Sequence, residues 1–203
     1  MRLDAGEPLP DVRDIAGLAM MGGPMSANDD LPWIPSMLDL IRASVESGVP
    51  VIGHCLGGQM LAKALGASVT RNPVKEIGWG KVDIHEGALA ARWGPSAPFL
   101  SYHWHGETFS LPEGAVRIWS SAHCANQAFV LGPHFGMQCH IEMTAELIET
   151  WCETGVDEIE RSVKRSPAVQ RPEEMRENVE ERLEALHAVA DCVYARWVEG
   201  LRS

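Results

Sequence analysis

A short glycine-rich segment places a cysteine between a predicted buried strand and a predicted helix. The segment reads Gly53-His54-Cys55-Leu56-Gly57-Gly58-Gln59 and follows the apolar residues 49–52. A cysteine on such a turn is typical of a nucleophile, because small neighbours let the chain fold back closely on itself. The first N–H groups of the following helix would then face the sulfur and favour thiolate over thiol. The alternative is a cysteine that simply packs at the end of a strand.

A nucleophilic cysteine needs a base, and the base needs a group that orients it. His140 and Glu142 are the candidates, since they end an apolar stretch and lie two residues apart. In an extended segment both side chains project to the same side. Cys55 and His140 also follow the carboxyl ends of predicted strands, which converge on one crevice in a parallel sheet. Taken alone, His140 would be equally well explained as a hydrogen-bonded core histidine.

A diglycine precedes the cysteine segment, in Met20-Met21-Gly22-Gly23-Pro24-Met25-Ser26. Acyl transfer needs N–H donors aimed at the developing oxyanion, and loss of one donor typically costs about 100–1000-fold in rate. The amide of Leu56, directly after the cysteine, is one natural donor. Gly23 is the candidate for the other, because glycine lets its N–H point inward. A plain tight turn would also explain the diglycine.

The elements that must position these residues alternate between strand and helix. We predict a strand over 15–21, a helix over 36–47, a strand over 49–52 and a helix over 57–65. This order indicates an α/β fold, with a mainly parallel sheet and helices on both faces. Shorter strands are predicted further on, at 79–84, 99–104, 116–120, 127–131 and 135–140.

The last 60 residues are predicted to be helical. Pro172 begins a helix well, and the acids that follow it suit the helix dipole. An apolar stripe from Met175 to Trp197 then indicates a helix that packs on its own domain. The alternative for this stripe is a subunit interface, so a homodimer stays open.

Composition narrows the classes of function. The chain has 203 residues with a net charge of −11, which argues against a nucleic-acid binder. No apolar run is long enough to span a membrane, and the first residues do not resemble a signal peptide. Five cysteines without a CxxC pair indicate free thiols, so we expect a cytoplasmic protein.

The diglycine segment 20–26, the cysteine segment 53–59 and the segment with His140 and Glu142, taken in this order, resemble the class I glutamine amidotransferases, which use a Cys-His-Glu triad. They are most similar to the stand-alone, GMP-synthase-like glutaminase branch. The resemblance covers nearly the whole chain and so implies one flavodoxin-like domain over 1–203, with a catalytic core over 1–145 and a helical part over 146–203. Further pieces that match are Glu76-Ile77-Gly78-Trp79, His103-Trp104-His105-Gly106-Glu107, Asn126-Gln127-Ala128-Phe129 and Gly136-Met137-Gln138-Cys139-His140-Ile141-Glu142.

The resemblance implies hydrolysis of the side-chain amide of glutamine. Cys55 would form a γ-glutamyl thioester, His140 would transfer protons, and Glu142 would orient His140. Gly23 and Leu56 would form the oxyanion hole. The residues implied to contact the substrate are Gly22, Gln59 and His105.

The chain departs from the family pattern in two places. Ile141 stands where the family usually has a proline between the histidine and the glutamate, but the spacing of the pair is kept. Family members also usually begin with a further strand and helix, and this chain starts where their second strand would begin.

Three alternatives follow from the same residues. The triad could instead cleave γ-glutamyl peptides, because the thioester would be identical, or the chain could be an inactive binding relative. A zinc site is the third, from His103, His105, His123, Cys124, Cys139 and His140, although their spacing matches no familiar pattern. We therefore expect no metal and no cofactor, a small-molecule substrate (glutamine or a γ-glutamyl compound), and a separate synthase partner that receives ammonia.

Overall fold

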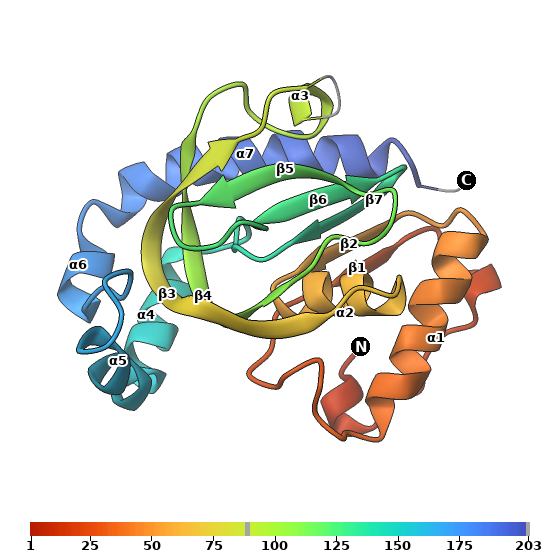
Figure 1. Cartoon of the computed structure of the whole chain (residues 1–203), viewed down its shortest axis with the longest axis horizontal. Helices are drawn as coiled ribbons and strands as arrows, with labels where there is room; N and C mark the ends of the chain where they lie inside the picture. Colours follow the sequence, from red (N-terminus) through yellow and green to blue (C-terminus); the bar gives the residue numbers. More distant parts are fainter. Residues whose placement is uncertain (88–89, 202–203) are drawn as a thin grey trace.

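One curved β-sheet forms the centre of the structure, and helices lie against it on both sides (Figure 1). The computed structural model describes residues 1–87 and 90–201. The described strands pair in the order β1-β2-β7-β6-β5-β3-β4. Their bounds are β1 (Leu18–Met20), β2 (Val51–His54), β3 (Val69–Ile84), β4 (Phe99–Phe109), β5 (Val116–Ser121), β6 (Ala128–Leu131) and β7 (His134–Met137). The predicted α/β class is confirmed.

The helices account for the rest of the regular structure. Short 3₁₀ turns at Leu3–Ala5 and Val12–Asp14 precede the sheet. The α-helices are α1 (Trp33–Glu46), α2 (Leu56–Ala64), α3 (Ala90–Trp93), α4 (Ala145–Thr154), α5 (Val156–Val163), α6 (Pro172–Arg176) and α7 (Val179–Val198). The stripe predicted as one helix from Pro172 is divided into α6 and α7, because Asn178 between them adopts the left-handed conformation, with φ 49°. None of the described helices is long and apolar enough to cross a membrane.

Parallel pairing is confined to three strands. β1 pairs with β2 and β2 with β7 in parallel, while β6, β5, β3 and β4 extend the sheet by antiparallel pairs. The reason is connection length: the helix α1 separates β1 from β2, whereas only Gly132 and Pro133 join β6 to β7. A two-residue turn makes antiparallel neighbours, and parallel neighbours need a long crossover. The strands that lead to the candidate residues are therefore the parallel ones.

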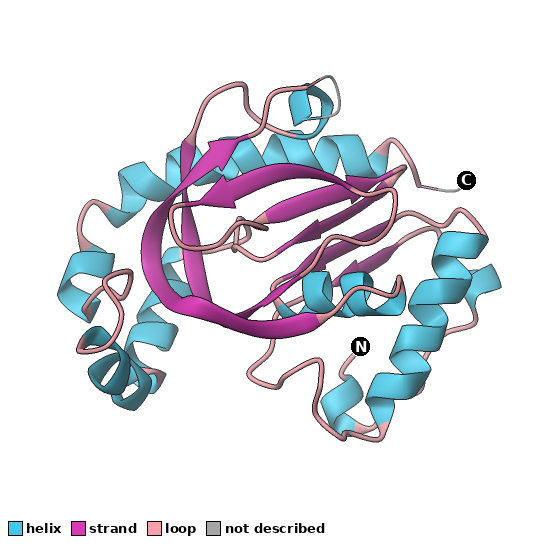
Figure 2. Ribbon diagram, in the orientation of Figure 1, coloured by secondary structure: helices cyan, strands magenta, loops and turns pink. Residues whose placement is uncertain are grey.

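β3 begins ten residues before the strand predicted at Trp79. It pairs with β4 along most of its length, with a register shift between Arg71 and Glu76. Pro73 lies inside this irregular part, and a proline without an N–H reads as a loop in the sequence. Figure 2 shows how strongly β3 curls, and the bend brings the middle of this strand, at Lys75, to Glu158 of α5.

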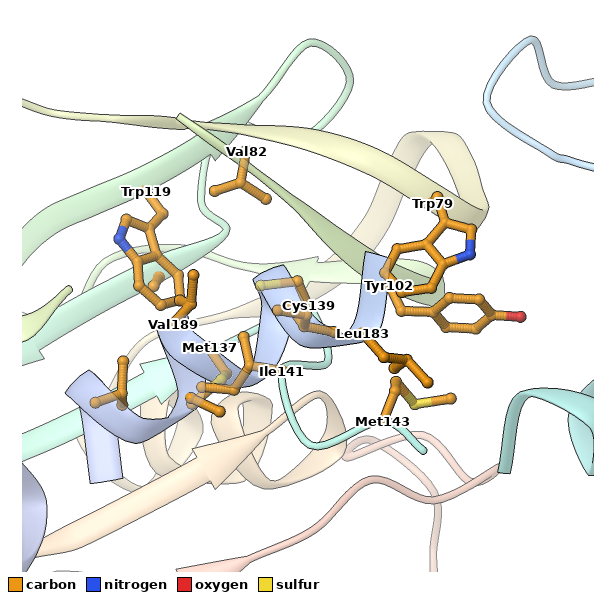
Figure 3. Close-up of a cluster of buried hydrophobic side chains, with 14 of the residues drawn as sticks. Trp79, Val82, Tyr102, Trp119, Met137, Cys139, Ile141, Met143, Leu183 and Val189 are labelled. Atoms are coloured by element: carbon orange, nitrogen blue, oxygen red, sulfur yellow. The ribbon is translucent and has the colours of Figure 1, made fainter. Parts of the chain in front are cut away.

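Two apolar cores hold the layers together. α1 and α2 pack against one face of the sheet, with Ile41, Leu61 and Phe129 fully buried between them. α7 packs against the other face through Leu183, Leu186, Val189, Ala190 and Val193. Figure 3 shows this second core, where Leu183 and Val189 of α7 face Trp119, Tyr102 and Met137 of the sheet. The stripe on α7 is thus used within the chain, as the sequence predicted.

The start of α2 lies unusually close to the strands beside it. A Cβ placed on Gly57 would come within 2.5 Å of the carbonyl oxygen of Met20, and one on Gly58 within 2.2 Å of that of Met137. Only glycine fits at these two positions, because the obstructing atoms belong to the backbone of β1 and β7. This close approach brings the N-terminus of α2 to the carboxyl ends of both strands.

Replacing Gly58 with alanine is expected to lower the free energy of unfolding by about 3 kcal/mol, since overpacking against an immobile backbone costs roughly 1–3 kcal/mol or more. Without the clash, alanine would stabilise a helix interior by about 0.5–1 kcal/mol relative to glycine. Urea denaturation of both proteins measures the difference. In a Gly200→Ala control the nearest atom to the added methyl would be the carbonyl oxygen of Trp197 at 3.3 Å, a tight contact but a far milder one than the 2.2 Å at Gly58, so a much smaller change is expected. A Gly58→Ala protein as stable as the parent would contradict this packing.

Candidate active site

Cys55 lies between the end of β2 and the start of α2, in a strained backbone conformation. Its φ is 49° and its ψ is −107°, and among the described residues only Asn178 is another non-glycine with positive φ. Such conformations cost of order 1–3 kcal/mol and persist only where the surrounding structure imposes them. The flanking glycines and the parallel strands impose this one. The side chain of Cys55 therefore faces a cleft instead of continuing the alternation of β2.

His140 and Glu142 form a buried pair after the end of β7. Nδ1–H of His140 donates to Oε1 of Glu142 at 2.6 Å, and the His140 side chain is 2% exposed. The predicted strand extends to His140, whereas β7 ends at Met137. Beyond β7, the backbone N–H of His140 donates to the carbonyl oxygen of Tyr102 at 2.8 Å. The ring of Trp151 packs edge-on against the imidazole, with centroids 5.0 Å apart. The two-residue spacing thus brings His140 and Glu142 together even though they do not lie in a regular strand.

The structure brings Cys55 and His140 together at Gly22. A Cβ placed on Gly22 would lie 3.0 Å from Cε1 of His140 and 3.5 Å from Cβ of Cys55, so both side chains border the same small space. Burial alone would lower the pKa of His140, but the charge of Glu142 and the neighbouring Cys55 outweigh it and raise that pKa. Within the described part of the chain, Nε2 of His140 makes no hydrogen bond. That nitrogen is free to exchange a proton in the cleft.

Gln138 is a neighbour of the sulfur that the sequence reasoning missed. Its Nε2 donates to Sγ of Cys55 at 3.5 Å, and its Oε1 accepts from Nε2 of Gln59 at 3.1 Å. On its other side, the thiol points to the carbonyl oxygen of Trp104 at 4.0 Å. The same two-residue spacing that links His140 to Glu142 also links Gln138 to His140, and could have identified it.

The two amides predicted as oxyanion donors border the same cleft. Leu56 is the first residue of α2, and Gly22 and Gly23 lie in the loop after β1. In the described structure, no acceptor binds the N–H of Leu56 or Gly23. The first amides of a helix have no partner within the helix, so the N–H of Leu56 is available to an anion. The structure therefore places Gly23, Cys55, Leu56 and His140 around one cleft, with Glu142 bonded to His140.

His105 and Gln59 also line the cleft, but both are tied to protein groups. His105 bonds through Nε2 to Glu76 at 3.0 Å and through Nδ1–H to the carbonyl of Glu107 at 2.9 Å. Glu76 in turn accepts from Ser121 and Gln127, at 2.8 Å each. Any substrate contact by His105 therefore depends on this buried network, which fixes the orientation of its ring.

Of the six residues considered as zinc ligands, the described structure groups only two. His105 and Cys124 lie with Glu76 in a buried group whose potential ligand atoms are all within 4.8 Å. Both oxygens of Glu76 already accept hydrogen bonds, and Cys124 bonds to Thr108 at 3.2 Å. The group is therefore an internally bonded network within the described residues.

The other cysteines differ from Cys55 in their surroundings. All five thiols are free. Burial raises the pKa of Cys124 and of Cys152, and it raises the pKa of Cys139 to about 12. These buried thiols are poor nucleophiles, because the thiolate is the reactive form and burial disfavours it. Cys192 is exposed on α7 and does not line the cleft.

Comparison with known proteins agrees with this geometry. The model of the family "Glutamine amidotransferase class-I" matches residues 4–151. A solved glutamine amidotransferase from Methylobacillus flagellatus superimposes with a TM-score of 0.97 and 48% identity, over 100% of this chain and 84% of that one.

Two curated relatives are similar over most of the chain. YfeJ of Salmonella typhimurium, named a glutamine amidotransferase-like protein, is 35% identical over 73% of this chain. One subunit of the glutamine-hydrolysing GMP synthase of Sulfurisphaera tokodaii is 31% identical over 68% of this chain and 72% of its own length. The chain spans 66% of YfeJ and less than a third of the undivided GMP synthases that it matches.

Proposed function

The chain belongs to the class-I glutamine amidotransferase family, and from this premise we propose that it hydrolyses the side-chain amide of glutamine through a γ-glutamyl thioester on Cys55. The observation that carries the proposal is the convergence of a strained cysteine at a helix N-terminus with a buried His–Glu pair. This arrangement supports acyl transfer more than a binding role. Cys55 lies at a helix N-terminus, as a nucleophile requires, and His140 is held by Glu142, as its base requires.

In the first half of the reaction, the Cys55 sulfur attacks the γ-amide carbon and forms a C–S bond. The carbonyl oxygen becomes an oxyanion that accepts from the amides of Leu56 and Gly23. His140 then gives its Nε2 proton to the amide nitrogen, the C–N bond breaks, and ammonia leaves. Glu142 holds the ring and stabilises its charged form throughout.

In the second half, His140 takes a proton from water at Nε2 as the water oxygen attacks the thioester carbon. The C–S bond breaks and glutamate is released, with the cysteine regenerated. Gln138 donates to the sulfur in both halves and holds the side chain of Gln59. We assign substrate contacts to Gly22, Gln59 and His105, of which His105 keeps its ring fixed by Glu76.

The proposal extends to a protein partner that accepts the ammonia and to a cytoplasmic location. The name of the Sulfurisphaera relative, which is one part of a synthase, supports a separate acceptor. The five free thiols suit a reducing compartment.

We expect the purified protein to convert glutamine into equal amounts of glutamate and ammonia. Glutamate is measured by an enzyme-coupled assay and ammonia by an independent one, so that their ratio reports simple hydrolysis. Asparagine, one methylene shorter, is the matched control and should be a poor substrate. Turnover of γ-glutamyl dipeptides with none of glutamine would overturn glutamine as the substrate.

A further inference from the structure

His54 lies directly before Cys55, and its side chain joins three elements of the fold. It is the last residue of β2, is 1% exposed and does not border the cleft. Its Nδ1 lies 3.2 Å from the carbonyl oxygen of Met20, the last residue of β1. Its Nε2 lies 2.9 Å from the hydroxyl of Tyr194 on α7. The ring thus links the end of the nucleophile's strand to β1 on one side and to α7 on the other.

The partners of the two ring nitrogens fix the direction of both hydrogen bonds. A carbonyl oxygen can only accept, so Nδ1 of His54 carries a proton and donates to Met20. Burial outweighs the charge of Glu142 and lowers the pKa of His54, so the ring is neutral and its Nε2 is an acceptor. Burial also raises the pKa of Tyr194, which keeps its proton and donates a hydrogen bond to that nitrogen. A chain of two hydrogen bonds therefore runs from Tyr194 through His54 to Met20.

The carbonyl oxygen of Met20 lies against the start of α2. A Cβ placed on Gly57 would be 2.5 Å from this oxygen, so the oxygen has little room on that side. In the part of the chain that the structure describes, the bond from His54 is the only side-chain hydrogen bond to β1. Gly23 lies in the loop that follows β1, and Leu56 is the first residue of α2. The distance between the two amides assigned to the oxyanion therefore depends on how the end of β1 is held.

Tyr194 reaches His54 from the face of the sheet opposite α1 and α2, where α7 lies (Figure 1). The two rings are tilted by 49° with their centroids 5.8 Å apart. The neighbouring Val193 is fully buried and anchors this part of α7 to the core. Without the hydroxyl, Nε2 of His54 would be a buried acceptor that lacks a donor, which is unfavourable. A turn of the ring towards another donor would relieve this and would break the bond to Met20.

We propose that His54 and Tyr194 are positioning residues, whose two hydrogen bonds hold the end of β1 at the distance from α2 that the oxyanion hole requires. The inference rests on the proposed thioester chemistry and adds to it two residues that touch neither the substrate nor the reacting atoms. They act through the backbone of the loop after β1. Because the amides of the oxyanion hole stabilise charge that develops only in the transition state, a displaced loop lowers kcat and leaves KM nearly unchanged.

Tyr194→Phe keeps the ring and removes only the hydroxyl. We expect kcat for glutamine to fall about 10-fold with KM changed less than about 2-fold, since loss of a complete oxyanion donor costs about 100–1000-fold and displacement costs part of that. Alkylation of Cys55 by iodoacetamide, followed by peptide mass spectrometry, should keep its parental rate, because attack on a methylene carbon creates no oxyanion. The pH profile of kcat/KM should also stay unmoved, which separates this role from one exerted through Glu142 and His140.

Two substitutions of His54 tell which of its bonds matters. The amide of an asparagine can take the place of Nδ1 and donate to Met20, whereas that of a glutamine can take the place of Nε2 and reach Tyr194. We expect His54→Asn to keep kcat within about 3-fold of the parent and His54→Gln to lose about 10-fold or more. Tyr194→Phe added to His54→Asn should cause no further loss, because the asparagine does not reach the hydroxyl.

Val193→Ala is the control for a general loosening of α7, since it removes buried methyl groups beside Tyr194 and keeps the hydroxyl. It should lower the stability to urea and leave kcat unchanged. An equal fall of kcat in Val193→Ala would overturn the positioning role. So would a rise of KM in place of the fall of kcat in Tyr194→Phe, or full activity of His54→Gln.

NMR separates failure of this inference from failure of the proposed function. A parent protein without activity on glutamine refutes the thioester chemistry but leaves both hydrogen bonds measurable. Nitrogen-15 shifts of the labelled histidine rings should show His54 neutral, with its proton on Nδ1. The amide signals of Gly23 and Leu56 should move in Tyr194→Phe, and they should keep their places in Val193→Ala. A His54 ring protonated on Nε2, or amide signals that Tyr194→Phe leaves unmoved, would refute the inference.

Discussion

Replacing Cys55 with alanine is expected to lower kcat/KM for glutamine by at least about 10⁴-fold, because the nucleophile of a triad carries most of its rate enhancement. Cys55 supplies the only thiol that both borders the cleft and adjoins the buried His–Glu pair of the described structure. The oxyanion donors that remain have no covalent intermediate to stabilise. Initial rates of glutamate formation measure the loss.

The variant keeps the Cβ and should keep the fold, which circular dichroism and urea denaturation check. Cys192→Ala is the matched control, because it removes an exposed thiol on α7 and should leave the rate unchanged. A Cys55→Ala protein that retained a tenth of the parental rate would show that another group is acylated.

Replacing Glu142 with glutamine is expected to lower kcat/KM roughly 100-fold or more, as loss of the orienting carboxylate does in other triads. The glutamine Oε1 can still accept from Nδ1 of His140, so the geometry is kept and the charge is removed. Glu142 raises the pKa of His140 against the effect of burial. Without that charge, burial dominates and the imidazolium loses its proton at lower pH.

The direction of the pH effect follows from this shift. Attack by a thiolate beside an imidazolium requires a protonated His140, so activity falls as the pH rises through the pKa of His140. In Glu142→Gln the basic limb of the kcat/KM profile should therefore move to lower pH. Glu149→Gln, which alters an exposed ion pair with Arg176, is the control and should leave the profile unmoved. A basic limb at the parental pH in Glu142→Gln would contradict the role given to Glu142.

The candidate site was predictable because its signals are local. Glycines around Cys55 and the two-residue spacing of His140 and Glu142 are visible in the sequence, and the parallel strands bring them together. Gln138 carried the same spacing but no unusual residue type, and it was missed. The sequence predicts a strand that ends at His140, whereas β7 ends at Met137. His140 stays extended beyond the strand because its backbone forms a bridge with Tyr102, which lies far away in the sequence.

Other features depend on contacts that no short segment contains. The early start of β3 was hidden by Pro73, and its pairing is with β4, which folds back on it. The break at Asn178 interrupts an apolar stripe whose spacing continues through it. Arg161 of α5 and Arg165 beyond it also border the cleft. Their position depends on the curl of the sheet, which brings β3 to α5 (Figure 1), and no local pattern shows it.

The most direct test of the central claim is to identify the acylated residue. A glutamine analogue with an electrophilic carbon at the γ position is incubated with the protein, and peptide mass spectrometry locates the adduct. We predict one equivalent of label, on Cys55, which excess glutamine prevents. Label on Cys192 or another residue, or glutamine hydrolysis that continues at the parental rate after Cys55 is fully labelled, would contradict the account.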